Sequence, residues 1–161
     1  MNAYKKTIYF YVLRIVKNHD LADDVSQLVF IKVYKNLKQF KGNSSFKTWV
    51  LRIATNTSLT ELSKNKRHQH DDLQETTLHL IDGFQDNVVE TNFKNAVDKT
   101  LDYLSPVQRM VFTLRHIHGK STKETSHIMD CSEGHIKKQL FLAIQKIRVH
   151  LNKLYPDHQW S

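Results

Sequence analysis

Apolar residues recur at the 3.6-residue spacing of amphipathic helices along most of this chain. The 161 residues include only four glycines and two prolines, and 40% of them are hydrophobic. Such a composition favours helices with short connections over a β-sandwich or a disordered chain. We therefore predict an all-α fold, with helices over residues 3–17, 20–40, 46–64, 91–104, 106–119, 121–130 and 132–151.

Charge divides the chain into three segments. The net charge is +9 over residues 1–67, −6 over residues 68–90 and +5 over residues 91–161. Two basic blocks around an acidic strip are typical of two polyanion-binding modules on a linker, although solubility alone is an alternative reason for basic charge. The predicted organisation is two small helical domains joined by a flexible acidic linker. Its segments are the domains 1–67 and 92–155, the linker 68–91 and a tail, 156–161.

The sequence offers little for a membrane, a metal or catalysis. No apolar run has the length of a membrane span and no leader-like segment opens the chain, so a cytoplasmic protein is expected. Cys131 is the only cysteine, which excludes an internal disulfide. The best histidine cluster, His68, His70, Asp71 and Asp72, has no second ligand pair at fixed spacing, so we expect no metal and no other cofactor. Phosphate loops, nucleophile elbows and zinc-protease motifs are missing from the sequence, which disfavours an enzyme.

A short polar loop precedes the third predicted helix. Ser44 or Ser45 is expected to cap this helix, and Trp49, Arg52 and Asn56 share one flank of it. Aromatic rings beside cations commonly hold single-stranded DNA, and a flipped base needs a small polar pocket. We interpret the loop 42–45 and this flank as a base-binding site. Trp49 could instead be a core ring, which is the role we expect for Phe46.

The C-terminal block has the spacing of a helix-turn-helix. Capping boxes are predicted at Ser105 with Gln108 and at Ser121 with Glu124, and Ser132 is expected to cap a long basic helix. A short helix, a tight turn and a long basic helix form a motif that places its second helix in the DNA major groove. The alternative is that the helix capped by Ser132 does not bind DNA and is only the basic, solvated helix of a helical bundle.

The helix predicted over residues 20–40, capped by Asp20, has an unusual outward face. Leu28 and Ile31 lie there among charged residues. We interpret them as part of a partner surface, while isolated exposed apolar residues, which are common, remain the alternative. The inward face is predicted to consist of Ala22, Val25, Val29, Phe30, Val33 and Leu37.

Together these motifs resemble the extracytoplasmic-function RNA polymerase sigma factors of the sigma-70 family, which contain only regions 2 and 4. Residues 20–34, DLADDVSQLVFIKVY, are similar to the helix that docks on the β′ clamp helices of the polymerase. Residues 40–56, which include GNSSFKTW, resemble the segment that opens and reads the minus-ten element. Residues 104–140 resemble region 4, which reads the minus-thirty-five element and contacts the β flap.

The resemblance implies three groups of site residues. The polymerase-binding group is Asp24, Gln27, Leu28, Ile31, Lys32 and Lys35. The minus-ten group is Gly42, Asn43, Ser44, Ser45, Lys47, Trp49, Arg52 and Asn56. The minus-thirty-five group is Ser132, Glu133, His135, Lys137, Lys138, Gln139 and Phe141.

The resemblance also implies partners and a location. The partners would be core RNA polymerase, promoter DNA and an anti-sigma factor, often membrane-anchored, with the sigma factor in the bacterial cytoplasm and at the nucleoid. The acidic linker would run through the polymerase channel that later holds RNA. A helix-turn-helix regulator independent of polymerase is the alternative, and it would not need the outward Leu28 and Ile31.

Some positions depart from the family pattern. Leu28 stands where an acidic residue is usual, and Thr125 and Ser126 replace an aliphatic residue and an alanine. The hydroxyl of Thr125 therefore needs a hydrogen-bond partner. Gln139 and Leu142 stand where arginines are frequent, so the minus-thirty-five sequence is not fixed by the resemblance.

Overall fold

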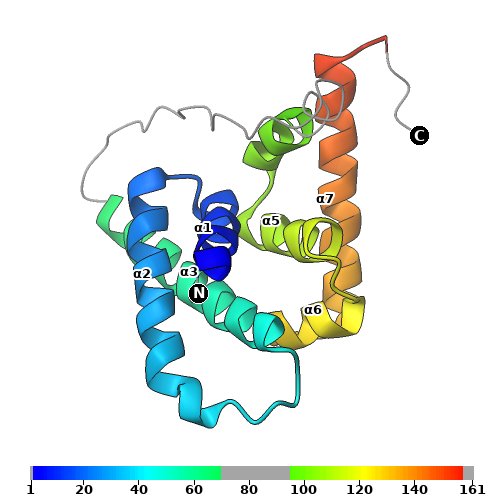
Figure 1. Ribbon diagram of the computed structural model, residues 1–161. Helices are drawn as coiled ribbons and strands as arrows, with labels where there is room; N and C mark the ends of the chain where they lie inside the picture. Colours follow the sequence, from blue (N-terminus) through cyan, green and yellow to red (C-terminus); the bar gives the residue numbers. More distant parts are fainter. Residues whose placement is uncertain (1, 70–94, 158–161) are drawn as a thin grey trace.

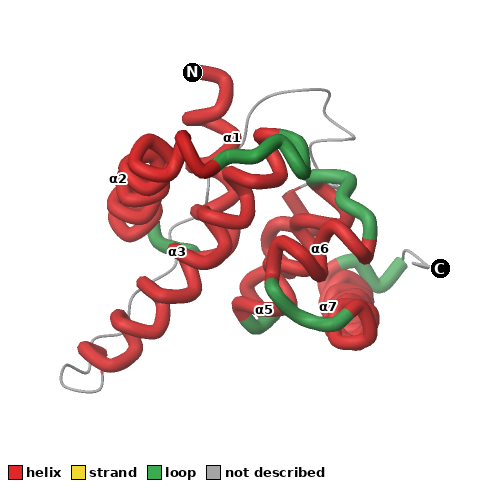
Figure 2. The backbone as a smooth tube through the Cα atoms, turned by 90° about the horizontal axis from the view of Figure 1, so that it is seen from below, coloured by secondary structure: helices red, strands yellow, loops and turns green. Residues whose placement is uncertain are grey.

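A computed structural model of the chain describes residues 2–69 and 95–157, so most of the predicted linker 68–91 lies outside the described residues. The all-α prediction is confirmed, since the described ranges contain helices and no strand (Figure 2). Residues 95–100 are also helical. The named elements are α1 (Asn2–Val16), α2 (His19–Asn36), the 3₁₀ turn η1 (Leu37–Gln39), α3 (Phe46–Gln69), the 3₁₀ turn η2 (Leu101–Tyr103), α5 (Pro106–Phe112), the π-helical turn η3 (Thr113–Ile117), α6 (Thr122–Met129) and α7 (Glu133–Leu154).

The helices α1, α2 and α3 form an N-terminal bundle. Each helix packs on the other two, and their apolar stripes meet in one core. At the centre lie Ile8 and Val12 of α1, Val25 of α2, and Leu51 and Ala54 of α3, all almost fully buried. The apolar residues that recur every 3.6 residues in the sequence are therefore the residues that face the core of this bundle.

Two details of α2 differ from the sequence prediction. Asn18, and not Asp20, caps the helix, because its side chain accepts a hydrogen bond from the Leu21 amide at 2.8 Å. The regular helix ends at Asn36, and Leu37 lies in η1 with 49% of its surface exposed. Its prediction as an inward residue is wrong, because the 3₁₀ turn changes the direction of the side chain relative to an α-helix.

Side-chain caps define the helices of the C-terminal half. Both predicted capping boxes are present, at Ser105 with Gln108 and at Ser121 with Glu124, and the Ser132 hydroxyl accepts from the His135 amide at 3.2 Å. Asp130 ends α6 in the left-handed conformation, at φ 52°. These local signals produce the short helix, tight turn and long helix that the sequence predicts.

The two halves of the chain pack directly against each other. Met110 and Leu114, from α5 and η3, and Ile128, from α6, belong to the same core as the N-terminal bundle. A second, smaller core lies under α7 and contains Leu101, Leu104, Ala143, Ile147 and Leu151. In Figure 1 α5 lies between α1 and α7, so α7 is on the outer side of the molecule. None of the helices in the described ranges is both long and apolar enough to span a membrane.

Candidate nucleic-acid interface

The loop before α3 is held by a serine cap. The Ser45 hydroxyl accepts a hydrogen bond from the Thr48 amide at 3.1 Å and lies 2.8 Å from the Thr48 hydroxyl. Gly42 has φ +74°, a conformation that glycine adopts without strain. Asn43, Ser44 and Ser45 are exposed at the start of the helix, and the Ser44 hydroxyl donates to the Ser45 carbonyl at 3.4 Å.

An aromatic cluster fixes the ring of Trp49. The Trp49 ring lies 5.3 Å from the ring of Phe40 and 5.8 Å from that of Phe46, and Tyr4 meets Phe46 edge-on at 5.8 Å. Trp49 and Phe46 are both half-buried and both pack against the bundle core. Both rings thus pack against the core, as we predicted for Phe46, and both keep part of their surface exposed.

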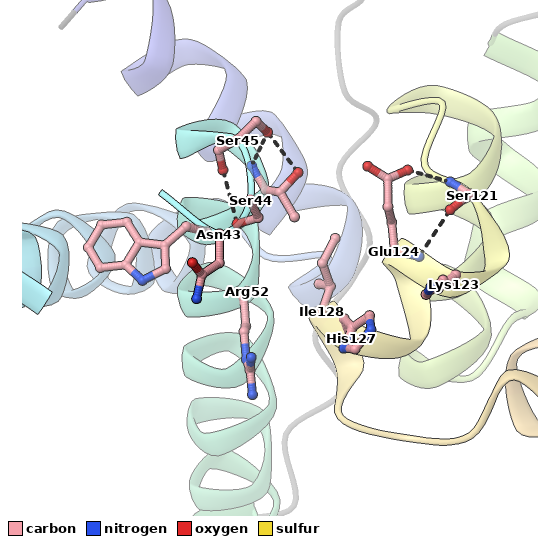
Figure 3. Close-up of a pocket in the computed structure, with 11 residues that line it drawn as sticks. Asn43, Ser44, Ser45, Arg52, Ser121, Lys123, Glu124, His127 and Ile128 are labelled. Atoms are coloured by element: carbon pink, nitrogen blue, oxygen red, sulfur yellow. Dashed lines mark hydrogen bonds between the residues drawn. The ribbon is translucent and has the colours of Figure 1, made fainter. Parts of the chain in front are cut away.

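The flank of α3 lines an open cleft of about 480 Å³. One wall is the loop and flank of α3, and the other is α6 (Figure 3). Arg52 and Asn56 are exposed on this flank, although only Arg52 lines the cleft itself. The lining residues are Asn43, Ser44, Ser45, Thr48, Trp49, Arg52, Ser121, Lys123, Glu124, His127 and Ile128.

The α6 wall was not predicted from the sequence as part of this site. Lys123, Glu124 and His127 belong to the first helix of the helix-turn-helix, more than 70 residues away along the chain. The Ser121 amide donates to the Glu124 carboxylate at 2.8 Å, and this hydrogen bond is the main reason that the pKa of Glu124 is lowered. A Glu124 carboxylate oxygen also lies 3.7 Å from Lys120 Nζ, and the cations Arg52 and Lys123 line the same cleft.

The helix-turn-helix presents a basic surface on α7. His135, Lys137 and Lys138 are exposed near its N-terminal end, and Phe141 is 60% exposed. Ser132 and Glu133 are exposed at the start of the helix, while Gln139 is half-buried. The Thr125 hydroxyl finds its partner in the Ser121 carbonyl at 2.8 Å. Burial, with a smaller contribution from Asp130, raises the pKa of the half-buried Cys131, which favours the neutral thiol.

Comparisons with known proteins cover both halves of the chain. Residues 1–68 match sigma-70 region 2, and residues 94–147 match sigma-70 region 4. The ECF RNA polymerase sigma-E factor of Haemophilus influenzae is 30% identical, over 97% of this chain and 86% of that protein. The sigma-E factor of Escherichia coli K12 is 31% identical, over 95% of this chain and 83% of that protein.

The chain belongs to the extracytoplasmic-function sigma factors. It is a sigma factor for transcription initiation, and the alternative of a polymerase-independent regulator is not favoured, because regions 2 and 4 both match and follow in the family order. The fold agrees with two solved structures. One is RpoE in complex with the anti-sigma factor NepR from Bartonella quintana, with a TM-score of 0.75, 21% identity and coverage of 92% of this chain and 91% of that one. The other is CnrH in complex with the cytosolic domain of CnrY, with a TM-score of 0.60, 20% identity and coverage of 97% and 86%.

In this sigma factor α2 carries the residues implied for polymerase binding. Asp24, Gln27 and Lys35 are exposed, and Leu28 and Ile31 are 37% and 49% exposed. The ammonium of Lys32 is turned back toward α3, where it donates to the Thr57 hydroxyl at 3.2 Å. The sequence analysis missed Tyr34, which is 80% exposed three residues after Ile31. The available signal was a tyrosine one helical turn from the predicted apolar partner surface, because tyrosines are enriched at protein interfaces.

Proposed function

We propose that the α3 flank of this sigma factor holds unstacked bases of the minus-ten element. The single observation that supports this most strongly is the half-buried Trp49, fixed by Phe40 and Phe46 and set beside exposed cationic and amide side chains. A ring fixed by its neighbours loses little side-chain entropy when a base stacks on it. Stacking of one base on an aromatic side chain contributes about 1–3 kcal/mol. The minus-ten group is Gly42, Asn43, Ser44, Ser45, Lys47, Trp49, Arg52 and Asn56.

The second part of the proposal is that α7 reads the minus-thirty-five element in the major groove. Long donor side chains near the start of a recognition helix reach base edges, and the neighbouring cations reach phosphates. The exposure of Lys137, Lys138 and His135 supports this role. The group also includes Ser132, Glu133, Gln139 and Phe141.

The third part is that the outward face of α2 docks on the β′ clamp helices of core RNA polymerase, while region 4 contacts the β flap. Leu28 and Ile31 would supply the apolar part of the contact, and Asp24, Gln27 and Lys35 its polar rim. Lys32 belongs to the same group, but its ammonium would have to leave the Thr57 hydroxyl to join that rim. Bond formation would then take place in the polymerase, and the sigma factor would supply binding energy alone. Its place of action would be the bacterial cytoplasm, at the nucleoid when it is bound to polymerase.

An anti-sigma factor is a further proposed partner. The sigma factor RpoE was captured with the anti-sigma factor NepR, and CnrH was captured with the cytosolic domain of CnrY. The similar fold supports a partner of the same class here, either free or membrane-anchored.

Run-off transcription with purified core polymerase on a promoter library tests the function as a whole. We expect the protein to select a subset of promoters that core polymerase alone does not use. Leu28→Asp should abolish both selection and co-purification with core polymerase, because a carboxylate would lie within an apolar contact. Leu154→Asp is the matched control, since Leu154 is a 49% exposed aliphatic residue at the other end of the molecule. Normal retention of Leu28→Asp would contradict the role of α2.

A further inference from the structure

Four aromatic rings from two separate segments of the chain meet at the surface of region 2. The Phe46 ring contacts three others, with centroid distances of 5.6 Å to Phe40, 5.8 Å to Trp49 and 5.8 Å to Tyr4. Phe40 and Trp49 also contact each other, at 5.3 Å. Three of the rings belong to residues 40–49, while Tyr4 comes from the first turn of α1. Helix α1 thus adds a fourth ring to the cluster that includes the proposed base-holding tryptophan.

Tyr4 is the most exposed ring of this cluster. Phe40, Phe46 and Trp49 are half-buried, whereas Tyr4 is 40% exposed. The Tyr4 ring meets the Phe46 ring edge-on, with 87° between the two planes. An edge-on contact occupies at most one face of a ring, so a planar group has access to the exposed part of the Tyr4 ring.

The cluster also limits how far Tyr4 lies from the bases proposed at Trp49. Phe46 contacts both rings at 5.8 Å, so the Tyr4 and Trp49 rings are separated by no more than two such steps. A base stacked on Tyr4 would therefore belong to a nucleotide close to those held at the α3 flank. Because Tyr4 lies on the Phe46 side of Trp49, that nucleotide would be at one end of the bound segment.

The charge around the cluster is suited to a phosphate backbone. An exposed lysine directly follows each of Tyr4, Phe40 and Phe46 in the sequence. Neither α1 nor the segment 37–60 contains an aspartate or a glutamate. Single-stranded nucleic acid binds where aromatic rings for the bases lie beside cations for the phosphates. The surface around Tyr4 has both kinds of group.

We propose that Tyr4 of α1 stacks on one further unpaired base of the promoter strand, next to the bases held at the α3 flank. The inference rests on the proposed function of that flank and extends the single-strand surface to the first helix of the protein. The occupant is a single-stranded nucleotide, because the ring continues the aromatic cluster of the minus-ten group and has lysines around it. The identity of the base would matter little, since every base has a π-face.

Stacking at Tyr4 would act on promoter melting. A base held on this ring cannot pair with the opposite strand, so the contact would help to keep the promoter open. The alternative role of Tyr4 is packing alone, in which its ring only covers Phe46. Tyr4→Leu separates the two roles, because leucine keeps an apolar contact with Phe46 but has no aromatic face for a base.

Strands of different length test the proposal with reconstituted holoenzyme. One fluorescein-labelled strand carries the minus-ten element of the strongest promoter that the library selects, and two others are extended by two nucleotides at the 5′ or the 3′ end. Fluorescence anisotropy gives the Kd of each strand. We expect extension at one end to strengthen binding about five-fold or more, the scale of one stacked base. Tyr4→Ala and Tyr4→Leu should lose this gain and bind the short strand normally, while Tyr4→Phe should keep the gain.

Tyr103→Ala is the matched control. Tyr103 is also an exposed tyrosine in a ring contact, since it is 55% exposed and stacks on His150 at 3.5 Å. It belongs to region 4, outside the aromatic cluster, so Tyr103→Ala should retain the full gain from the extended strand.

The outcomes separate the inference from the function on which it rests. No gain from either extension, or an equal gain in Tyr4→Ala, overturns the role of Tyr4 while the proposed function stands. Equal losses on the short and the extended strands in Tyr4→Ala and Tyr4→Leu would show that Tyr4 only supports Phe46, and would also overturn it. Absence of binding of every strand by the unmodified holoenzyme overturns the proposed role of the α3 flank and the inference with it.

Discussion

The two candidate DNA surfaces of this sigma factor differ in what lies opposite them. The α3 flank with Trp49 and Arg52 faces α6 across a cleft, and its capping segment is hydrogen-bonded to Lys120. The α7 surface with Lys137 and Lys138 is exposed, and α7 packs through its other face on α5, α6 and η2. The same packing therefore sets α6 opposite the candidate single-strand surface and leaves the candidate duplex surface of α7 without a helix opposite it among the described residues.

The largest effect should come from removal of the stacking ring. Trp49→Ala should reduce open-complex formation by roughly 5- to 150-fold, the equivalent of the about 1–3 kcal/mol that base stacking supplies. Permanganate reactivity of promoter thymines, measured with the reconstituted holoenzyme, reports the melted strand. Binding of minus-thirty-five duplex DNA should stay at the level of the unmodified protein. Unchanged thymine reactivity would contradict a role of Trp49 in holding bases.

The complementary change on α7 should have a smaller effect and the opposite pattern. Lys137→Ala with Lys138→Ala should weaken duplex binding roughly ten-fold at moderate salt, while the salt slope falls by about 0.9 for each lost phosphate contact. Binding of the minus-ten strand by the isolated protein should not change. A loss of strand binding in this variant would remove the distinction between the two surfaces.

The sequence predicts the parts of this molecule that depend on neighbouring residues. Ser105, Ser121 and Ser132 cap their helices as predicted, because a cap needs only the next three residues. The exposed flank of Arg52 and Asn56 likewise follows from helical spacing alone. Those predictions required no knowledge of how the two halves meet.

The sequence did not predict contacts between residues far apart in the chain. The sequence analysis assigns no role to Arg109, but its guanidinium is buried against the Ile15 carbonyl, 94 residues away. Lys120 gives no signal for a bond to Thr48, and α6 gives none for a wall of the cleft. Such contacts depend on the packing of two modules, which one-dimensional patterns of spacing and charge do not encode.

The smallest predicted effect uses a histidine at the contact between the modules. His118 meets the Tyr11 ring edge-on at 5.3 Å, and its Nε2 is buried without a hydrogen-bond partner among the described residues. Burial, followed by the nearby cations Lys47, Arg14 and Lys120, lowers the pKa of His118 to about 4. The ordinary value of 6.5 applies when the site is exposed to water. Protonation of His118 therefore favours the unfolded chain. The stabilisation that the neutral ring gives to the folded protein is fully present above pH 6.5 and is lost as the pH falls toward 4.

Replacement of this histidine by an aromatic residue that does not titrate isolates its contribution. Between pH 7 and pH 5 the free energy of unfolding in urea should fall by about 1 kcal/mol less in His118→Phe than in the unmodified protein, after allowance for the partial exposure of the ring. His135→Phe is the matched control, because His135 is exposed on α7. Its pH profile should follow that of the unmodified protein, since this replacement leaves His118 and its surroundings unchanged. Equal profiles for all three proteins would show that protonation of His118 does not lower the free energy of unfolding. The difference between the two surfaces would then rest only on the position of α6 and on the hydrogen bond from Lys120 to Thr48.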